Sequence, residues 1–77
     1  MEINMAKVVR LRVGELLRER NMSSGDLSEK AGIAPLTARM LAKGQTERVD
    51  LVVMAKVCTA LNVEPGELFS LLEENNA

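Results

Sequence analysis

The chain has 77 residues, 47% hydrophobic and 27% charged, a composition typical of one small globular domain rather than a disordered segment. It contains one cysteine, no histidine and one aromatic residue, which excludes an intrachain disulfide and a structural zinc site, so no metal or cofactor is expected. The net charge is −1, but the charges are unevenly distributed. Residues 1–56 hold all ten basic residues and seven acidic ones, whereas residues 57–77 hold four acidic residues and no basic one. This distribution predicts a mildly basic surface on one part of the domain only.

The sequence predicts a cytoplasmic protein without a membrane segment. No apolar run approaches the ~20 residues that a membrane-spanning helix needs, and the first residues do not resemble a secretion signal. We expect a flexible leader at 1–6, a single domain at 7–73 and a flexible tail at 74–77. The chain has no nucleophile motif and no phosphate-binding loop, so it is not expected to be an enzyme.

Apolar and basic residues alternate in the N-terminal segment, a pattern typical of a strand: Val9, Arg10, Leu11, Arg12 and Val13. We expect a short strand or extended segment at about 7–11, with its basic residues on the solvent side, followed by a helix at about 12–20. One continuous helix across 7–20 is the alternative interpretation.

Two short helices are predicted next, with a sharp turn between them. Ser23 has the spacing of a helix cap, with Asp26 three residues later, and this helix extends to about Lys30. Gly32 supplies a left-handed turn position. The next helix covers about 35–42, because it opens on a proline and is followed by a glycine.

The remaining residues predict two more helices. Asp50 caps a fourth helix with apolar residues at helical spacing. Pro65 opens a fifth helix, whose apolar side comprises Leu68, Phe69, Leu71 and Leu72. The predicted fold is therefore all-α, with five helices and a short N-terminal strand. Its predicted core consists of Leu16, Leu27, Ile33, Leu41, Leu51, Met54, Cys58, Leu61, Leu68 and Phe69.

Residues 23–43 have the pattern of a helix-turn-helix. Ser28 is small where the helices meet, Gly32 provides the turn, and three apolar residues anchor the pair, namely Leu27, Ile33 and Leu41. The run D-L-S-E-K-A-G-I-A at 26–34 resembles the E-L-A-E-K-x-G-I-S run of Cro/phage-repressor-type (XRE-like) regulators.

Two further motifs extend this resemblance to about residues 8–72. K-G-Q-T-E-R-V-D-L at 43–51 looks like the N-G-K-x-x-R-[IV]-[DS]-[LF] loop of a subfamily of small regulators. A-L-N-V-E-P-G-E-L at 60–68 is similar to its A-L-N-x-x-P-G-D-L ending. The resemblance implies a phage-repressor-like DNA-binding domain and a transcriptional regulator of bacterial or phage type. Its partner would be double-stranded DNA.

The resemblance also implies which residues contact DNA. The helix at 35–42 would lie in the major groove and read bases through Pro35, Leu36, Thr37, Arg39 and Met40. Phosphates would be bound by Ser23, Ser24, Lys43, Thr46 and Arg48. Base contacts would specify the sequence, and phosphate contacts would position the protein.

Several departures from the family pattern weaken this expectation. Ala34 replaces the usual Ser or Thr cap, Pro35 and Leu36 offer no side-chain hydrogen bond, and Glu47 adds a negative charge beside the phosphates. We therefore expect weaker or less specific DNA binding than is usual for this fold. The alternative function is a protein-interaction module on the same fold, an anti-repressor or antitoxin-like partner with little or no DNA binding.

A homodimer is expected for two reasons. One short helix reads too few base pairs for useful specificity, and two-fold DNA sites match two-fold proteins. In addition, the predicted strand has no predicted strand in its own chain with which to pair. The residues expected at the dimer interface are Val9, Leu11, Val13, Leu71 and Leu72.

Overall fold

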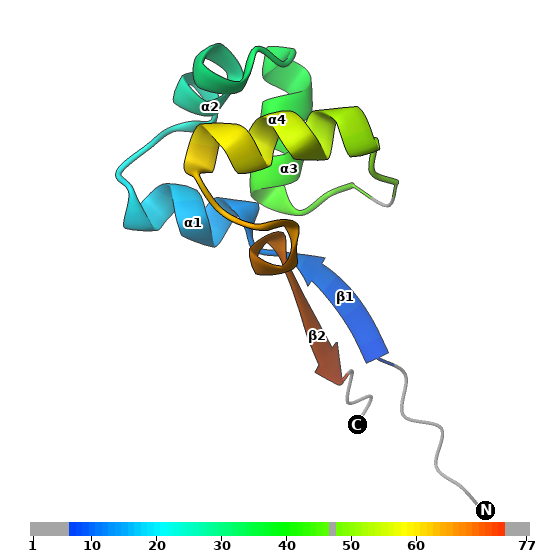
Figure 1. Cartoon of the computed structure of the whole chain (residues 1–77). Coiled ribbons are helices and arrows are strands. Elements are labelled where there is room, and N and C mark those ends of the chain that lie inside the picture. The colour runs from blue at the N-terminus through cyan, green and yellow to red at the C-terminus, as the bar shows by residue number, and fades with distance from the viewer. Residues whose placement is uncertain (1–6, 47, 74–77) are drawn as a thin grey trace, which may run out of the picture.

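The computed structural model describes residues 7–46 and 48–73. In these residues four α-helices form a helical body, and a two-stranded sheet projects from one side of it (Figure 1). The elements in chain order are β1 (Lys7–Leu11), α1 (Val13–Glu19), α2 (Ser24–Ala31), α3 (Pro35–Lys43), α4 (Leu51–Leu61), the 3₁₀ helix η1 (Pro65–Leu68) and β2 (Phe69–Glu73).

The helices begin and end at residues whose side chains or backbone suit those positions. Ser23 forms a reciprocal capping box with Asp26: its hydroxyl accepts from the Asp26 amide at 3.0 Å, and the Asp26 carboxylate accepts from the Ser23 amide at 2.9 Å. Asp50 caps α4 by accepting from the Val52 amide at 2.8 Å. Gly32 and Gly44 end α2 and α3 at φ of 72° and 69°. The predicted caps and turns of these three helices are confirmed.

The core lies between the helices. The fully buried members contributed by α1, α2, α4 and η1 are Val13, Leu27, Val57 and Leu68. Seven of the predicted core residues are buried, and Ile33 and Phe69 are half-buried against that cluster. Leu51 was predicted to be buried, and this prediction is wrong: its side chain is 81% exposed. Leu51 follows the cap in the first turn of α4, and helical spacing alone does not show that this turn extends beyond the neighbouring helices.

A close approach between α1 and the end of α3 depends on a glycine. A Cβ atom built on Gly14 would lie well inside van der Waals distance of the Ala42 carbonyl oxygen. Gly14 therefore allows the first turn of α1 to lie directly against the last turn of α3.

The prediction of a fifth helix is wrong. Residues 65–68 form η1, and residues 69–73 form β2, which pairs antiparallel with β1. In this register Leu11 lies opposite Phe69, and Val9 lies opposite Leu71. The run Phe69-Ser-Leu-Leu is too short for its periodicity to distinguish a helix from a strand, whereas pairing with β1 satisfies the backbone of both segments. The strand predicted at 7–11 is confirmed, and the single helix across 7–20 is excluded.

Candidate nucleic-acid interface

The helix-turn-helix is formed by α2 and α3, which pack against each other around a buried serine. The Ser28 hydroxyl donates to the Ile33 carbonyl oxygen at 2.6 Å, which ties α2 to the turn before α3. On the inner side of α3, Ala38 and Leu41 are buried at 0% and 2% exposure. This packing fixes the orientation of α3, so its opposite side is held towards solvent.

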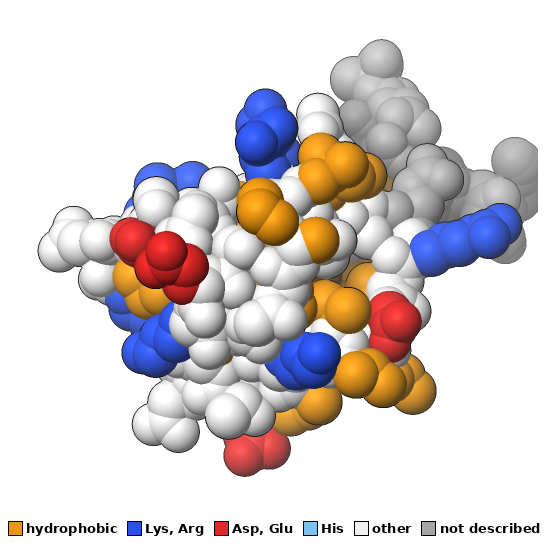
Figure 2. Space-filling view, turned by 90° about the horizontal axis from the view of Figure 1, so that it is seen from above, with side chains coloured by type: hydrophobic (Ala, Val, Ile, Leu, Met, Phe, Trp, Pro, Cys, Tyr) orange, Lys and Arg blue, Asp and Glu red, His pale blue; other side chains and the backbone are white. Residues whose placement is uncertain are grey.

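The outer side of α3 carries an exposed stripe, which we define as Leu36, Arg39, Met40 and Lys43. These positions recur at three- and four-residue spacing, so they lie on one side of the helix. Leu36 is 59% exposed and Met40 is 37% exposed. On the face seen from above, hydrophobic side chains reach the surface in several groups, with basic side chains standing singly between them (Figure 2).

The structure leaves most of the residues expected to read bases accessible. Pro35, Leu36, Arg39 and Met40 are all exposed. Thr37 is half-buried and lines a hollow of about 260 Å³ between α3 and the start of α4, together with Met40 and Val49. Thr37 therefore faces the side of the stripe rather than its centre.

The residues expected to bind phosphate fall into two groups. At the start of α2 the Ser23 hydroxyl is occupied by the capping box, and the carboxylate of Asp26 adds negative charge at the same helix end. Ser24 beside it is half-buried. These features disfavour an anion there despite the helix dipole. In the second group, Lys43 and Arg48 are exposed, and Thr46 is half-buried between α3 and α4. Glu47 lies outside the described residues.

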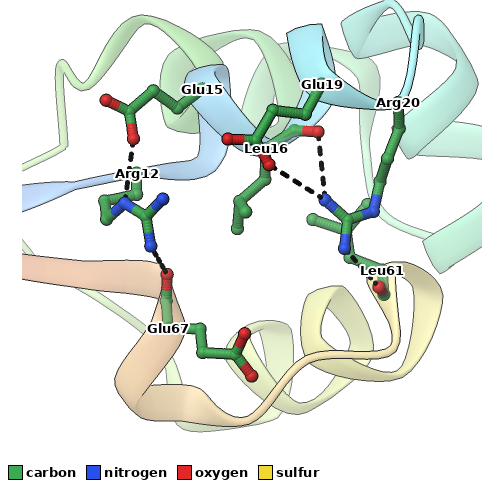
Figure 3. Close-up of polar contacts among 7 residues, drawn as sticks. All are labelled: Arg12, Glu15, Leu16, Glu19, Arg20, Leu61 and Glu67. Carbon is green, nitrogen blue, oxygen red and sulfur yellow. Dashed lines mark hydrogen bonds and ion pairs between the residues drawn. The ribbon is translucent and has the colours of Figure 1, made fainter.

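Two arginines are committed to internal contacts and are therefore poor candidates for DNA (Figure 3). Arg12 donates to Glu15 at 2.8 Å and to the Glu67 carbonyl oxygen at 3.2 Å, which links the start of α1 to η1. The hydrogen bond with Glu15 raises the pKa of Arg12. Arg20 donates to the Leu61 carbonyl oxygen at 3.2 Å, at the C-terminal end of α4.

The basic residues of the stripe have no such partners. Among the side chains of residues 7–46 and 48–72, the ion pairs formed are those of Arg12 and Arg20, and Arg39 and Lys43 take part in none. Their charges are therefore available to an external anion.

A cleft of about 560 Å³ separates the sheet from the end of α3 and adds basic residues that the sequence interpretation missed. Arg10 on β1 and Arg18 on α1 line this cleft together with Lys43. The sequence placed Arg10 on the solvent side of a strand and gave Arg18 no role. The alternation in the N-terminal segment could have indicated Arg10, but no local pattern shows that α1 lies beside the end of α3.

The expected dimer residues are divided by the structure. Val9, Leu71 and Leu72 are 63%, 60% and 45% exposed. Val13 is fully buried in the core, so its assignment to an interface is wrong. Leu11 is half-buried against the core, and its assignment stays a prediction. A dimer was also expected because the N-terminal strand had no predicted partner in its own chain. This reason is wrong, since β1 pairs with β2 of the same chain. The alternating pattern of the segment did not show that Val13 begins α1 and turns inward.

Cys58 lies in the core and takes no part in the interface. Burial raises the pKa of its thiol, and Glu64 and Glu67 raise it further. Cys58 is therefore a neutral, poorly nucleophilic thiol. No group of His, Cys, Asp and Glu side chains in the described part of the chain could hold a metal ion. None of the helices described there is long and apolar enough to span a membrane.

Two short helices joined at a left-handed glycine, with the second held by its inner side and exposed on its outer side, define a helix-turn-helix protein. The family model described as the Cro/C1-type HTH DNA-binding domain matches residues 3–74. The chain belongs to this family of DNA-binding transcriptional regulators.

Individual relatives agree with this assignment. The chain is 31% identical over 64 residues to YozG of Bacillus subtilis, an uncharacterized HTH-type transcriptional regulator; the match covers 83% of this chain and 74% of the relative. It is 34% identical to the restriction-modification controller protein C.AhdI of Aeromonas hydrophila, with a TM-score of 0.67 over 75% of this chain and 86% of that one. It is 29% identical to the transcriptional regulator VanUg, with a TM-score of 0.66 over 96% of each chain.

Proposed function

We propose that the protein is a sequence-specific transcriptional regulator that binds DNA as a homodimer and reads the major groove with α3. The observation that carries this proposal is the exposed stripe of α3, which is held outward by the buried Ala38 and Leu41. Its two cations form no ion pair with any side chain of residues 7–46 and 48–72. A helix presented in this way has the geometry required to enter the major groove. The relatives named as regulators support the same function.

Base reading in this proposal depends mainly on Arg39. Its planar guanidinium can donate two parallel hydrogen bonds, a geometry that the ammonium of Lys43 lacks, and its best partner is the O6/N7 edge of guanine. Leu36 and Met40 are exposed apolar side chains, which can contact the methyl group of thymine. With so few polar readers, each protomer specifies few base pairs, and the protein depends on two half-sites for specificity.

Phosphate binding is assigned to Lys43, the last residue of α3, and to Arg48, which lies in the connection between α3 and α4. Arg10 and Arg18 extend the positive charge from Lys43 along the cleft beside the sheet. Because these contacts are electrostatic, they act on every DNA sequence alike and weaken as salt rises.

The test compares two alanine variants on a duplex obtained by in vitro selection with the purified protein. Arg39→Ala should lose about 1–3 kcal/mol of binding free energy on that duplex and little on random DNA. Lys43→Ala should weaken binding to both duplexes and reduce the slope of log K against log salt by about one unit. Lys56→Ala, an exposed lysine on α4, is the matched control and should change neither.

Fluorescence anisotropy at several salt concentrations measures all three effects. If the wild-type protein binds no duplex at ~50 mM salt, the proposal fails, because phosphate attraction is strongest at low salt. Equal losses for Arg39→Ala on selected and random DNA would also contradict it, because Arg39 would then contact phosphate and not a base.

A further inference from the structure

The outer half of the sheet carries apolar side chains that the helical body does not cover. At the inner end, Leu11 and Phe69 face each other and pack against the core. Further out, the paired Val9 and Leu71 are 63% and 60% exposed, and Leu72 on the opposite face is 45% exposed. A two-stranded ribbon in water is marginally stable, and exposed apolar residues on both faces are typical of a surface that another chain covers.

One hydrogen bond identifies which backbone groups point outward at the sheet edges. The Arg12 amide donates to the Leu68 carbonyl oxygen at 2.7 Å, which continues the ladder of β1 and β2 by one position. Hydrogen-bonded pairs alternate along an antiparallel ladder, so Arg10–Ser70 and Val8–Leu72 are also bonded pairs. The amide and carbonyl of Leu71 therefore point away from β1, towards the open edge of β2.

We propose that a second copy of this chain pairs with β2 along this edge, antiparallel and about a two-fold axis at Leu71. This inference rests on the homodimer of the proposed function and specifies its interface. Leu71 of each copy donates its amide to, and accepts at its carbonyl from, Leu71 of the other copy. The two ribbons become one four-stranded sheet, in which both edges of each β2 are satisfied.

The side chains fit this arrangement. Leu71 shares a face of the sheet with Val9, because residues opposite each other in an antiparallel pair point to the same side. Across the two-fold axis the row becomes Val9, Leu71, Leu71 of the second copy and Val9 of the second copy. Four exposed apolar side chains then form one continuous row, and the same residues that are exposed in the monomer shield one another.

Charge favours β2 over β1 as the pairing edge. β1 carries Lys7 and Arg10, so pairing two β1 strands would bring four cations onto adjacent strands. Residues 69–72 of β2 carry no charge. The contact is nevertheless small, because it consists of two five-residue strands. The free dimer should therefore be weak and should be strengthened by a duplex that holds two half-sites.

The test measures the oligomeric state without DNA, by sedimentation velocity, in two charge variants of the same sheet face. Leu71→Glu would place two negatively charged side chains directly opposite each other across the axis, with Cα atoms about 5.5 Å apart, and should abolish the dimer. Val9→Glu would place its carboxylates three strand spacings apart, about 14 Å, and should leave most of the dimer intact. Helical circular dichroism confirms that both variants fold.

Cysteine cross-linking gives a second measurement that does not depend on destabilising the protein. With oxidised glutathione, Leu71→Cys should form a disulfide-linked dimer, because its Cα atoms would lie within disulfide distance. Val9→Cys should not form this disulfide. The native Cys58 is buried, so the wild-type protein gives the background level of cross-linking.

The inference is overturned if the wild-type protein is a monomer up to ~1 mM, if Val9→Glu dissociates the dimer as strongly as Leu71→Glu, or if Val9→Cys cross-links at least as fast as Leu71→Cys. Each of these results tests the oligomeric state and not DNA binding. A wild-type protein that binds DNA yet fails these tests would retain the DNA-binding function and lose only this interface.

Discussion

The helical body and the sheet differ in how their apolar residues are used. In the body, Leu27 and Val57 are completely buried, and α2 and α4 begin at side-chain caps. In the sheet, the central pair Val9–Leu71 is mostly exposed although its backbone is regular. The body therefore has its own core, whereas the outer sheet has a defined backbone and incomplete side-chain packing. The helical body supplies the stability of the fold, and the sheet supplies the surface of the proposed dimer.

The largest expected effect tests the stability side of this comparison. Leu27→Ala should lower the free energy of unfolding by about 2–5 kcal/mol, because it leaves a cavity in a fully packed core. Val9→Ala should cost less than about 0.5 kcal/mol in dilute protein, where its side chain is in water. Urea unfolding monitored by circular dichroism measures both. Similar losses for the two variants would show that the sheet is part of the core.

The second prediction concerns the close approach of α1 to α3. Gly14→Ala should destabilise the protein by about 1–3 kcal/mol, because the new Cβ would clash with the Ala42 carbonyl oxygen and the two helices must separate. Gly66→Ala in η1 is the matched control, since nothing lies within 4 Å of its added Cβ. Thermal unfolding of both variants tests this, and equal stability of the two would contradict the contact.

The third prediction concerns the caps at the N-terminal ends of α3 and α4. Ala34 has extended backbone at the start of α3 and no side-chain cap, so Ala34→Ser should raise the free energy of unfolding by about 0.5–1 kcal/mol. Asp50→Ala should lower it by about 1 kcal/mol, because the amides of Val52 and Val53 lose their acceptor. Chemical denaturation of the two variants should show shifts of opposite sign. Shifts in the same direction would show that the stability of these two helices does not depend on their caps.

The smallest expected effect is a difference in the hydrogen-exchange rates of neighbouring backbone amides in β2. In dilute protein, the amide of Leu72 should exchange with deuterium more slowly than the amide of Leu71, because Leu72 is bonded to Val8 and Leu71 faces outward. At high concentration the proposed dimer should slow Leu71 and leave Val9 fast. NMR-detected exchange at two concentrations provides the measurement. Protection that does not alternate along the strand would show that the ladder has the opposite phase.

The body was largely predictable from sequence because its signals are local. The capping box at Ser23, the left-handed Gly32 and Pro35 at the start of α3 act within a few residues of themselves. β2 was not predictable in this way, because its partner lies near the opposite end of the chain. Leu51 has helical spacing identical to that of a core residue, and only the position of its turn relative to the neighbouring helices exposes it.

The candidate site was predictable to a similar extent. Four of the five positions of α3 expected to read bases are exposed, as helical spacing predicts, whereas Thr37 is half-buried. The Ser23 cap is local and was predicted, and it leaves the hydroxyl engaged with the Asp26 amide. The lining of one cleft by Arg18 and Lys43, in contrast, depends on packing between elements. Val13 was assigned to an interface because its alternation with Arg12 matches a strand, whereas the chain turns into α1 at that point.

The pairing of β1 with β2 also sets the order in which the protein folds. The two strands close a loop that contains all four helices, and such long-range closure is entropically costly until the intervening chain is compact. The helices contact one another across shorter stretches of chain, as α1 does with α3 and α2 does with α4, so their closure costs less. We therefore expect the transition state for folding to contain the helices without the sheet. Substitutions at Val9 or Leu71 should then leave the folding rate unchanged and alter only the rate of unfolding.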